Sequence, residues 1–446
     1  MTNKKFKLAA MSLATAVAVS TVGPSASAVT YYLGDGSVTV DKDDTRGAYS
    51  YQGEDGSEKH RTYVNEDKAD NGVIYVKDGN APTEEVPSTT DNSNNSTEVP
   101  TPTDNATQST DASGNNTENS STSETTTGNT ITVMEDVKKT EKTDGTEGND
   151  VKIVVDSVNA DTSETGKSTV TIGEGADVDL TVKDSNLTTG GHGIDIGVNL
   201  EGKDENKGAN VDLTLDNTNI NLTEKDNTAG IVARDHSKVE VTLKGENTID
   251  GKEALEDAAQ EAEAAKKEGK SSPNRNVEGI RVGGENAGDD SSGKGASLTI
   301  KGDETSDQGS LNIDHTSTGM VISNGSDVTL TDNADVDIKH TEAGSSTQGG
   351  RGIVQRGDLT VEDKSSLTID TVGSGAYKID NDQEGLVYGN NGYGIDSTDD
   401  ITVTGDSTLE IKGTQSSAIY GGTGSSLTVE AVSYTHLRAH ETLRHL

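Results

Sequence analysis

The chain has 446 residues, and its 77 Asp and Glu against 37 Lys and Arg give a formal net charge of −40. It contains 51 Gly, one Phe, no Trp and no Cys. Without thiols it cannot form a disulfide-stapled module, a zinc–thiolate site or a cysteine nucleophile. The strongly negative charge also argues against binding to duplex nucleic acid, whose phosphates would meet a like-charged surface.

Residues 1–28 have the three parts of a secretory signal peptide. Lysines at positions 4, 5 and 7 precede an apolar stretch over 8–19, and Ala26-Ser27-Ala28 forms a small-residue cleavage site. The apolar stretch is too short to cross the roughly 30 Å of hydrocarbon in a bilayer. We therefore expect an exported bacterial protein that is secreted or displayed on the cell surface.

Two regions of different composition follow. Residues 29–79 contain β-branched and aromatic runs such as Val38-Thr39-Val40, separated by Gly and Asp turns, which predicts a small N-terminal β module or cap. Residues 80–130 consist largely of Thr, Ser, Asn, Asp, Glu and scattered Pro. Because such a segment has little to bury, we predict a disordered acidic linker.

Residues 131–431 carry an internal repeat of three short strands in a fixed order. A strand that opens with Gly and a large aliphatic residue precedes two strands in which apolar and polar residues alternate. The tightest cycle, from Ile395 to Ile419, is 24 residues long. The opening pairs are Gly193-Ile194, Gly230-Ile231, Gly279-Ile280, Gly319-Met320, Gly352-Ile353, Gly394-Ile395 and the variant Ala418-Ile419.

This order predicts an all-β fold, a right-handed parallel β-helix. One cycle has too few aliphatic residues to form a core, whereas stacked cycles would align them into continuous interior ladders. The opening pairs predict seven turns, with one or two incomplete turns before Ile194. A β-sandwich is the competing fold, but it needs hairpins between neighbouring strands and does not predict the fixed order.

Two segments depart from the repeat. Residues 252–269 have acids early, lysines late and Gly at the end, which predicts a helical insertion. Because this helix is polar nearly all round, we expect it to project from a turn. It is either an insertion that the fold tolerates without a role of its own or a contact surface. Residues 432–446 resemble the in-frame translation of a transposase sequencing-library adapter, so we interpret them as an artefactual tail that replaces the natural C-terminus. A genuine His-rich metal-binding tail is the alternative.

The repeat resembles that of bacterial secreted and cell-surface right-handed parallel β-helix proteins, which have the pectate-lyase-like fold. This fold family includes pectate lyases, polygalacturonases and the passengers of adhesins and autotransporters. The resemblance covers residues 131–430 and rests on periodicity. It therefore implies a fold and leaves the choice between an enzyme and a surface rod open.

Two short segments are similar to elements of the polygalacturonases. Gly191-His192-Gly193 resembles their Gly-His-Gly segment, and Asp396 with Asp399-Asp400 resembles their paired carboxylates, which would supply the acid and base of an inverting hydrolysis. In that family the carboxylates precede the Gly-His-Gly segment, whereas here they follow it. We therefore expect His192 to be a turn or surface residue and Asp399-Asp400 to be a solvated turn.

A lyase would need an Arg base beside carboxylate-held calcium. Arg234 and Arg356 share one phase of the repeat, and counting in twos from Ile231 and Ile353 places both on the solvent face. Residues 190–195 also resemble the start of a calcium-binding repeats-in-toxin nonapeptide, but a single copy does not make a site.

Two further kinds of residue could contact ligands. Acidic turns such as Asp289-Asp290 would bind calcium only weakly. Sugar-binding clefts usually offer stacking aromatic residues, and the candidates in the repeat are Tyr377, Tyr388, Tyr393 and Tyr420.

We therefore expect a non-catalytic bacterial cell-surface protein, an adhesin-like or structural rod. We assign no catalytic, cofactor-binding or metal-binding residues and no cofactor beyond weakly bound calcium. The expected partners are glycans or proteins of the host or the cell wall, and we expect no binding to nucleic acid. We also expect no transmembrane segment in this fragment, and we expect that an anchor was lost with the natural C-terminus. The alternative is a secreted polysaccharide lyase or glycoside hydrolase of the β-helix class.

Overall fold

The computed structural model describes residues 29–41, 48–52, 58–65, 73–79, 125–137, 151–202, 207–224, 226–268, 276–284, 295–303, 309–342, 350–370, 372, 392–414, 416–430 and 435–439. The predicted signal peptide, most of the predicted linker and most of the C-terminal tail lie outside these residues.

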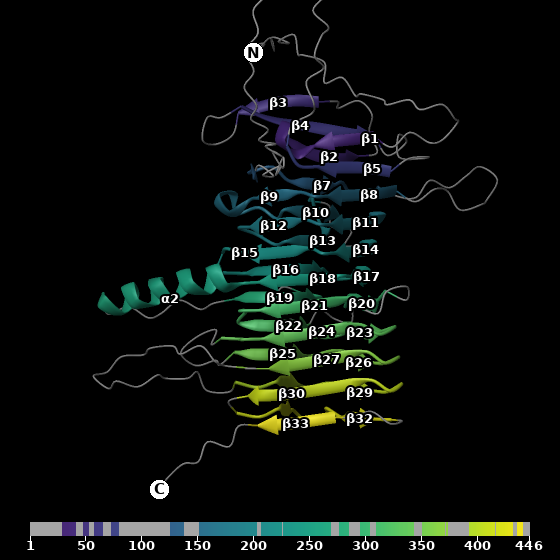
Figure 1. Ribbon diagram of the computed structural model, residues 1–446, viewed down its shortest axis with the longest axis vertical. Coiled ribbons are helices and arrows are strands. Elements are labelled where there is room, and N and C mark those ends of the chain that lie inside the picture. The colour runs from purple at the N-terminus through teal and green to yellow at the C-terminus, as the bar shows by residue number, and fades with distance from the viewer. Residues whose placement is uncertain are drawn as a thin grey trace, which may run out of the picture.

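Three sheets of stacked strands form the molecule, and the chain coils through them in a repeating order (Figure 1). Among the described residues, every strand pairing is parallel except that between β3 and β4. The predicted right-handed parallel β-helix is therefore confirmed, and the hairpins that a β-sandwich would need do not join its repeating strands.

The first sheet, sheet A, contains the second strand of each cycle. In spatial order it comprises β1 (Val29–Tyr32), β5 (Val73–Lys77), β8 (Val151–Asp156), β11 (Asp177–Lys183), β14 (Asn210–Asp216), β17 (Lys238–Lys244), β20 (Ser297–Gly302), β23 (Asp327–Thr331), β26 (Asp358–Val361), β29 (Ile401–Val403) and β32 (Leu427–Val429).

Sheet B contains the strands that open with Gly and an aliphatic residue. In spatial order it comprises β3 (Ala48–Gln52), β4 (Glu58–Asn65), β2 (Ser37–Asp41), β7 (Ile131–Val133), β10 (Val170–Gly173), β13 (Ile194–Val198), β16 (Thr228–Ala233), β19 (Val277–Val282), β22 (Thr318–Ile322), β25 (Arg351–Gln355), β28 (Ile395–Ser397) and β31 (Ile419–Gly421).

Sheet C contains the third strand of each cycle. It comprises β6 (Thr126–Thr127), β9 (Asn159–Asp161), β12 (Asn186–Thr189), β15 (Asn219–Leu222), β18 (Glu246–Asp250), β21 (Ser310–Asp314), β24 (Asp335–Lys339), β27 (Ser366–Asp370), β30 (Thr408–Thr414) and β33 (Thr435–Ala439). Two short 3-10 turns, η1 (Leu33–Asp35) and η2 (Ser163–Thr165), lie between strands.

The core lies inside the coil and is made of aliphatic ladders. Strand positions that pair between turns carry the same kind of side chain, so Leu180 lies beside Leu213, and Leu213 beside Val241. Their side chains are at most 1% exposed. Each turn therefore buries its apolar face against its two neighbours, which is why one cycle alone could not form a core.

Strands from residues 29–79 continue the sheets of the main coil. In sheet A, β1 pairs with β5 and β5 with β8, while in sheet B, β2 pairs with β7. The strand β6, at the end of the segment 80–130, pairs with β9 in sheet C. At the opposite end, β33 lies within the segment 432–446 and pairs with β30.

The helix α2 (Lys252–Lys267) projects sideways from the coil between β18 and β19 (Figure 1). It lies within the predicted insertion 252–269. Only its first turns pack against the coil, since Ala254, Leu255 and Ala258 are buried while its other described side chains are exposed. The Asp250 carboxylate accepts the Lys252 N–H at 2.9 Å at the start of the helix.

Candidate functional site

The outer face of sheet B carries polar side chains that are covered rather than solvated. Asp195, Arg281 and Asp396 occupy one column of this face, immediately after the buried Ile of their turns. Because side chains alternate along a strand, they point away from the core. They are nevertheless only 4%, 2% and 6% exposed. Asp396, one of the carboxylates that the sequence singles out, therefore belongs to this covered face.

Both candidate lyase arginines form ion pairs with aspartates of neighbouring turns. Arg234 contacts Asp195 with two hydrogen bonds, of 2.8 Å from Nε and 2.9 Å from Nη2. Arg356 approaches Asp396 at 3.3 Å, and Arg351 contacts the second oxygen of the same carboxylate at 3.1 Å. Each guanidinium is therefore held by a carboxylate, and neither Arg234 nor Arg356 extends freely into solvent.

His192 lies in the turn between β12 and β13, but it is buried, at 8% exposure, rather than on the surface. Its Nδ1 accepts the Ala229 N–H at 3.1 Å. Burial lowers its pKa to about 4, Asp195 opposes this shift, and Arg281 and Arg234 add to it. At neutral pH the imidazole is therefore uncharged, and the ring proton lies on Nε2.

A buried ion pair that the sequence analysis did not identify lies on the same face. Arg281 Nε donates to Glu278 Oε2 at 2.6 Å, and its Nη2 donates to the Asn227 amide oxygen at 3.0 Å. Burial raises the pKa of Glu278, and the charge and hydrogen bond of Arg281 oppose that shift. The pattern that could have revealed the pair is that opposite charges flank Gly279-Ile280, whereas no other opening pair of the repeat has a charged residue on both sides.

The carboxylates of Asp399 and Asp400 lie in the turn between β28 and β29, close to Asp358 of the preceding turn. Asp399 is half-buried and Asp400 is exposed. The pKa values of Asp358 and Asp327 are raised, mainly by burial and to a smaller extent by the negative charge of the neighbouring Asp399. This cluster can attract cations, but its carboxylates also repel one another.

The structure does not bring the Gly-His-Gly segment and the paired carboxylates together. Sheet B places β13, beside His192, five strand steps from β28, beside Asp399 and Asp400. At about 4.8 Å between neighbouring strands, these steps correspond to roughly 24 Å. His192 and the carboxylates therefore cannot act on the same glycosidic bond.

Two of the four candidate tyrosines stack on each other. The rings of Tyr393 and Tyr420 lie 4.6 Å apart at an angle of 10°, and Tyr420 is 50% exposed. Burial raises the pKa of Tyr393. Tyr377, Tyr388 and the acidic turn Asp289-Asp290 lie outside the described residues.

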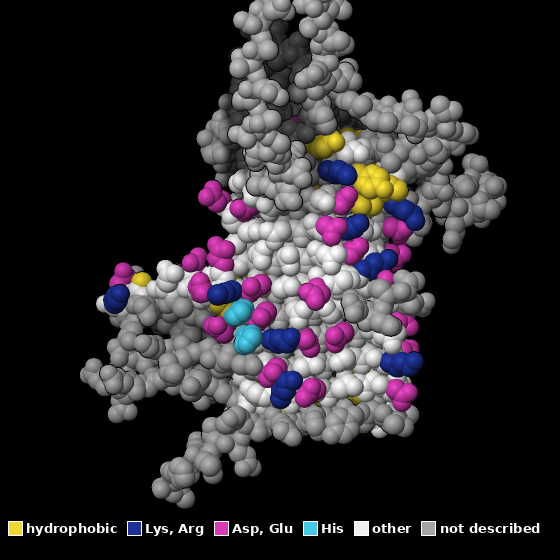
Figure 2. Space-filling view, viewed as in Figure 1, with side chains coloured by type: hydrophobic (Ala, Val, Ile, Leu, Met, Phe, Trp, Pro, Cys, Tyr) yellow, Lys and Arg dark blue, Asp and Glu magenta, His cyan; other side chains and the backbone are white. Residues whose placement is uncertain are grey.

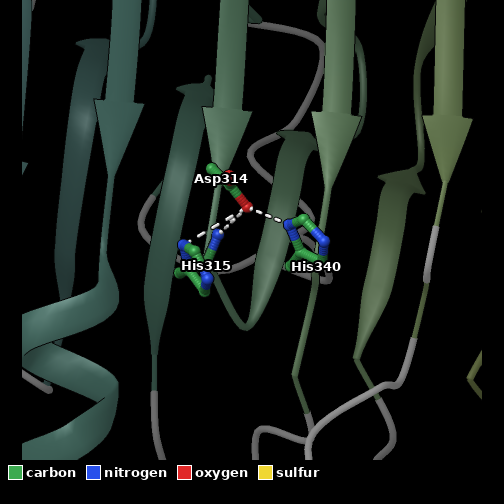
Figure 3. A group of neighbouring side chains, drawn as sticks. All are labelled: Asp314, His315 and His340. Atoms are coloured by element: carbon green, nitrogen blue, oxygen red, sulfur yellow. Dashed lines mark hydrogen bonds and ion pairs between the residues drawn. The ribbon is translucent and has the colours of Figure 1, made fainter.

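A second cluster that the sequence analysis missed lies at the edge of sheet C. Asp314, His315 and His340 bring one carboxylate and two imidazoles together (Figure 3). The sequence pattern that could have indicated this cluster is that each His directly follows the third strand of its cycle, at the same position in consecutive turns. Elsewhere, acidic side chains with interspersed Lys and Arg are scattered over the face shown in Figure 2.

Comparison of the chain with protein-family models, curated proteins and solved structures found no match. Among the described residues, no helix combines the length and apolar character needed to cross a membrane.

Proposed function

We propose that this protein is an exported bacterial cell-surface rod, adhesin-like or structural, without catalytic activity. The observation that carries the proposal is that the two arginines that a lyase would use as a base link one turn of the coil to the next. Arg234 joins Asp195 across neighbouring turns, and Asp396 is shared by Arg351 and Arg356. A general base must be free to take a proton from substrate, whereas these groups are held by opposite charges.

The stacked architecture supports the same proposal. Each turn packs only against its neighbours, so a solenoid can carry ligand-binding side chains along its outside without needing a deep pocket. The signal-peptide pattern and the acidic surface are consistent with an exported, soluble rod. Glycans or proteins of the host or the cell wall are the proposed partners.

The test combines localisation with an activity assay. Antibodies against the folded protein should label intact producing cells, and brief protease treatment of those cells should remove the label. If the protein is found only inside the cells, the proposal of surface display is wrong.

The alternative, a secreted polysaccharide lyase or hydrolase, is supported by the carboxylate cluster of Asp358, Asp399 and Asp400. The purified chain should leave polygalacturonate and related polyuronates intact. Depolymerisation that disappears in the double variant Asp399→Ala and Asp400→Ala would show an enzyme instead. A variant of Glu410, a half-buried carboxylate on sheet C, serves as the matched control.

A further inference from the structure

The cluster at the edge of sheet C repeats one residue type in consecutive turns. Asp314, at the end of β21, pairs with Lys339, at the end of β24, so His315 and His340 follow at equivalent positions. Both histidines have left-handed backbone conformations, with φ of 48° and 47°. Their rings are stacked, with centroids 5.2 Å apart and planes inclined by 17°. The coil itself therefore sets the spacing of the two imidazoles.

The Asp314 carboxylate lies between the two rings (Figure 3). Its Oδ1 lies 2.8 Å from His340 Nδ1 and 3.3 Å from His315 Nδ1. One donor atom from each of the three residues lies within 4.8 Å of the others. An ion with bonds of about 2.0 Å in tetrahedral geometry holds its ligands roughly 3.3 Å apart. Two of the three separations are already near that value.

Rotation of the side chains can bring the third pair of donor atoms to the separation that the ion requires. The side chains of His315 and His340 are 29% and 47% exposed, so their rings can turn toward a common ion without displacing core residues. The Asp314 side chain is 27% exposed. The same exposure leaves an open coordination position for water.

The neighbouring charges favour a cation. Asp250, in the turn on the other side of β21, places a carboxylate oxygen 3.2 Å from His315 Nδ1. Lys339, the register partner of Asp314, directs its ammonium to Asp337 at 2.7 Å and to the Asn312 amide oxygen at 3.3 Å. A nearby positive charge is therefore already engaged by other groups, while two carboxylates adjoin the imidazoles.

We propose that Asp314, His315 and His340 bind a divalent transition-metal ion of the zinc class. Imidazole and carboxylate together suit Zn²⁺, whereas Ca²⁺ and Mg²⁺ prefer all-oxygen sites. In the metal-free protein each imidazole Nδ1 that faces the Asp314 oxygen must carry a proton to form a hydrogen bond, and the metal ion replaces that proton. The proposal is independent of whether the protein acts as a surface rod.

Zinc titration of the full chain by calorimetry, in buffer without chelating components, tests the site. The double variant His315→Asn and His340→Asn should lose one equivalent of bound zinc or bind it at least ten-fold more weakly. Asn is the appropriate replacement because it tolerates the left-handed backbone better than most residues. Millimolar Ca²⁺ should not displace the zinc.

The matched control is the double variant His436→Asn and His440→Asn, because the C-terminal tail also contains histidines. It should retain the zinc equivalent that the first variant loses. The same stoichiometry and affinity in wild type and in the His315/His340 variant would overturn the proposal. So would loss of that equivalent in the tail variant alone.

A second variant distinguishes the loss of a metal-binding side chain from a loss of folding. Asp314→Asn keeps an oxygen that can accept the His315 N–H, which Asp314 Oδ1 now accepts at 2.9 Å. It should unfold at the wild-type temperature without zinc, yet show a smaller rise in that temperature when zinc is added, because a ligand of the native state stabilises it. An equal rise in both proteins would contradict the assigned role of Asp314.

Discussion

The glycine that opens each cycle is fixed by close packing between turns. A Cβ at Gly279 would lie 2.3 Å from Ile313 Cγ2 and 2.4 Å from the Gly319 carbonyl oxygen. Since the second of these atoms belongs to backbone, it cannot easily move. We expect Gly279→Ala to lower the free energy of unfolding by about 2 kcal/mol or more, measured by urea denaturation.

The last turn of this series supplies the control, because it has alanine, Ala418, at the equivalent position. The change Ala418→Gly should alter the free energy of unfolding by less than about 1 kcal/mol. Equal losses in the two variants would show that glycine is not required by contact between turns.

Replacing one partner of the buried Glu278–Arg281 ion pair should lower the free energy of unfolding more than replacing both partners. Arg281→Met leaves the Glu278 carboxyl buried without its partner, and we expect a loss of about 3 kcal/mol in unfolding free energy at pH 7. The double variant Glu278→Gln and Arg281→Met should recover a large part of that loss. Additive losses in a double-mutant cycle would contradict this expectation.

His192 should make the stability depend on pH between about 6.5 and 4. Its pKa is 6.5 in the unfolded chain and about 4 in the folded protein, so the unfolded chain takes up a proton first. Its contribution is therefore complete above pH 6.5 and is lost as the pH falls through this window, by up to about 3 kcal/mol.

His192→Asn provides the comparison, since the Asn side chain can still accept the Ala229 N–H. The wild type should lose more stability than the variant when urea denaturation is repeated at pH 7 and pH 4.5. Carboxylates titrate in both proteins and cancel in the difference. Parallel pH profiles would show that the neutral form of His192 is not favoured by the fold.

At the scale of elements, α2 should depend on its first turns. Leu255 is 2% exposed where the helix leaves the coil, and its truncation to Ala should cost about 2 kcal/mol. Because the helix projects outward, we expect this cost to appear as faster hydrogen exchange in the first turns of α2, with β18 and β21 unchanged. Ala264→Ser, at an exposed position, should have little effect; faster exchange in both variants would contradict this account.

The repeat of aliphatic residues was sufficient to predict the strands of the coil and their parallel stacking. Gly279 and Ile280 show why: the glycine is required by a close approach between turns and the isoleucine by burial, and the same two constraints recur from Gly193 to Gly394. The polar sites were harder to predict. His315 and His340 are 25 positions apart in the sequence, and only the register of β21 with β24 brings their rings together.

The same limitation applies to residues 29–79. Their alternating residues predict strands, but because the polar segment 80–130 separates them from the repeat, the sequence does not indicate which strands they pair with. The structure pairs β5 with β8 across that segment. Likewise, the pattern places Arg234 on the outer face, but the partner that holds it, Asp195, belongs to the preceding turn. Contacts between turns therefore determine what each polar residue can do.

At the scale of the whole molecule, the net charge of −40 should make stability rise with salt. Ion pairs between turns oppose this trend, such as Lys152 with Asp179 at 3.5 Å and Lys301 with Glu240 at 2.8 Å. Because these pairs are partly exposed, each contributes at most about 1 kcal/mol. Repulsion among the unbalanced carboxylates extends over many turns, and at 0.1 M salt it is screened beyond about 10 Å.

We therefore expect the midpoint of thermal unfolding to rise by several degrees between about 10 mM and 300 mM NaCl, with most of the gain below about 100 mM, where the screening length changes most. The measurement is made at pH 7 without divalent cations, and equal concentrations of sucrose control for general solute effects. A midpoint that falls with NaCl would show that the ion pairs between turns contribute more than the net repulsion. In that case attraction between opposite charges on neighbouring turns would outweigh the repulsion that the net negative charge exerts on the coil.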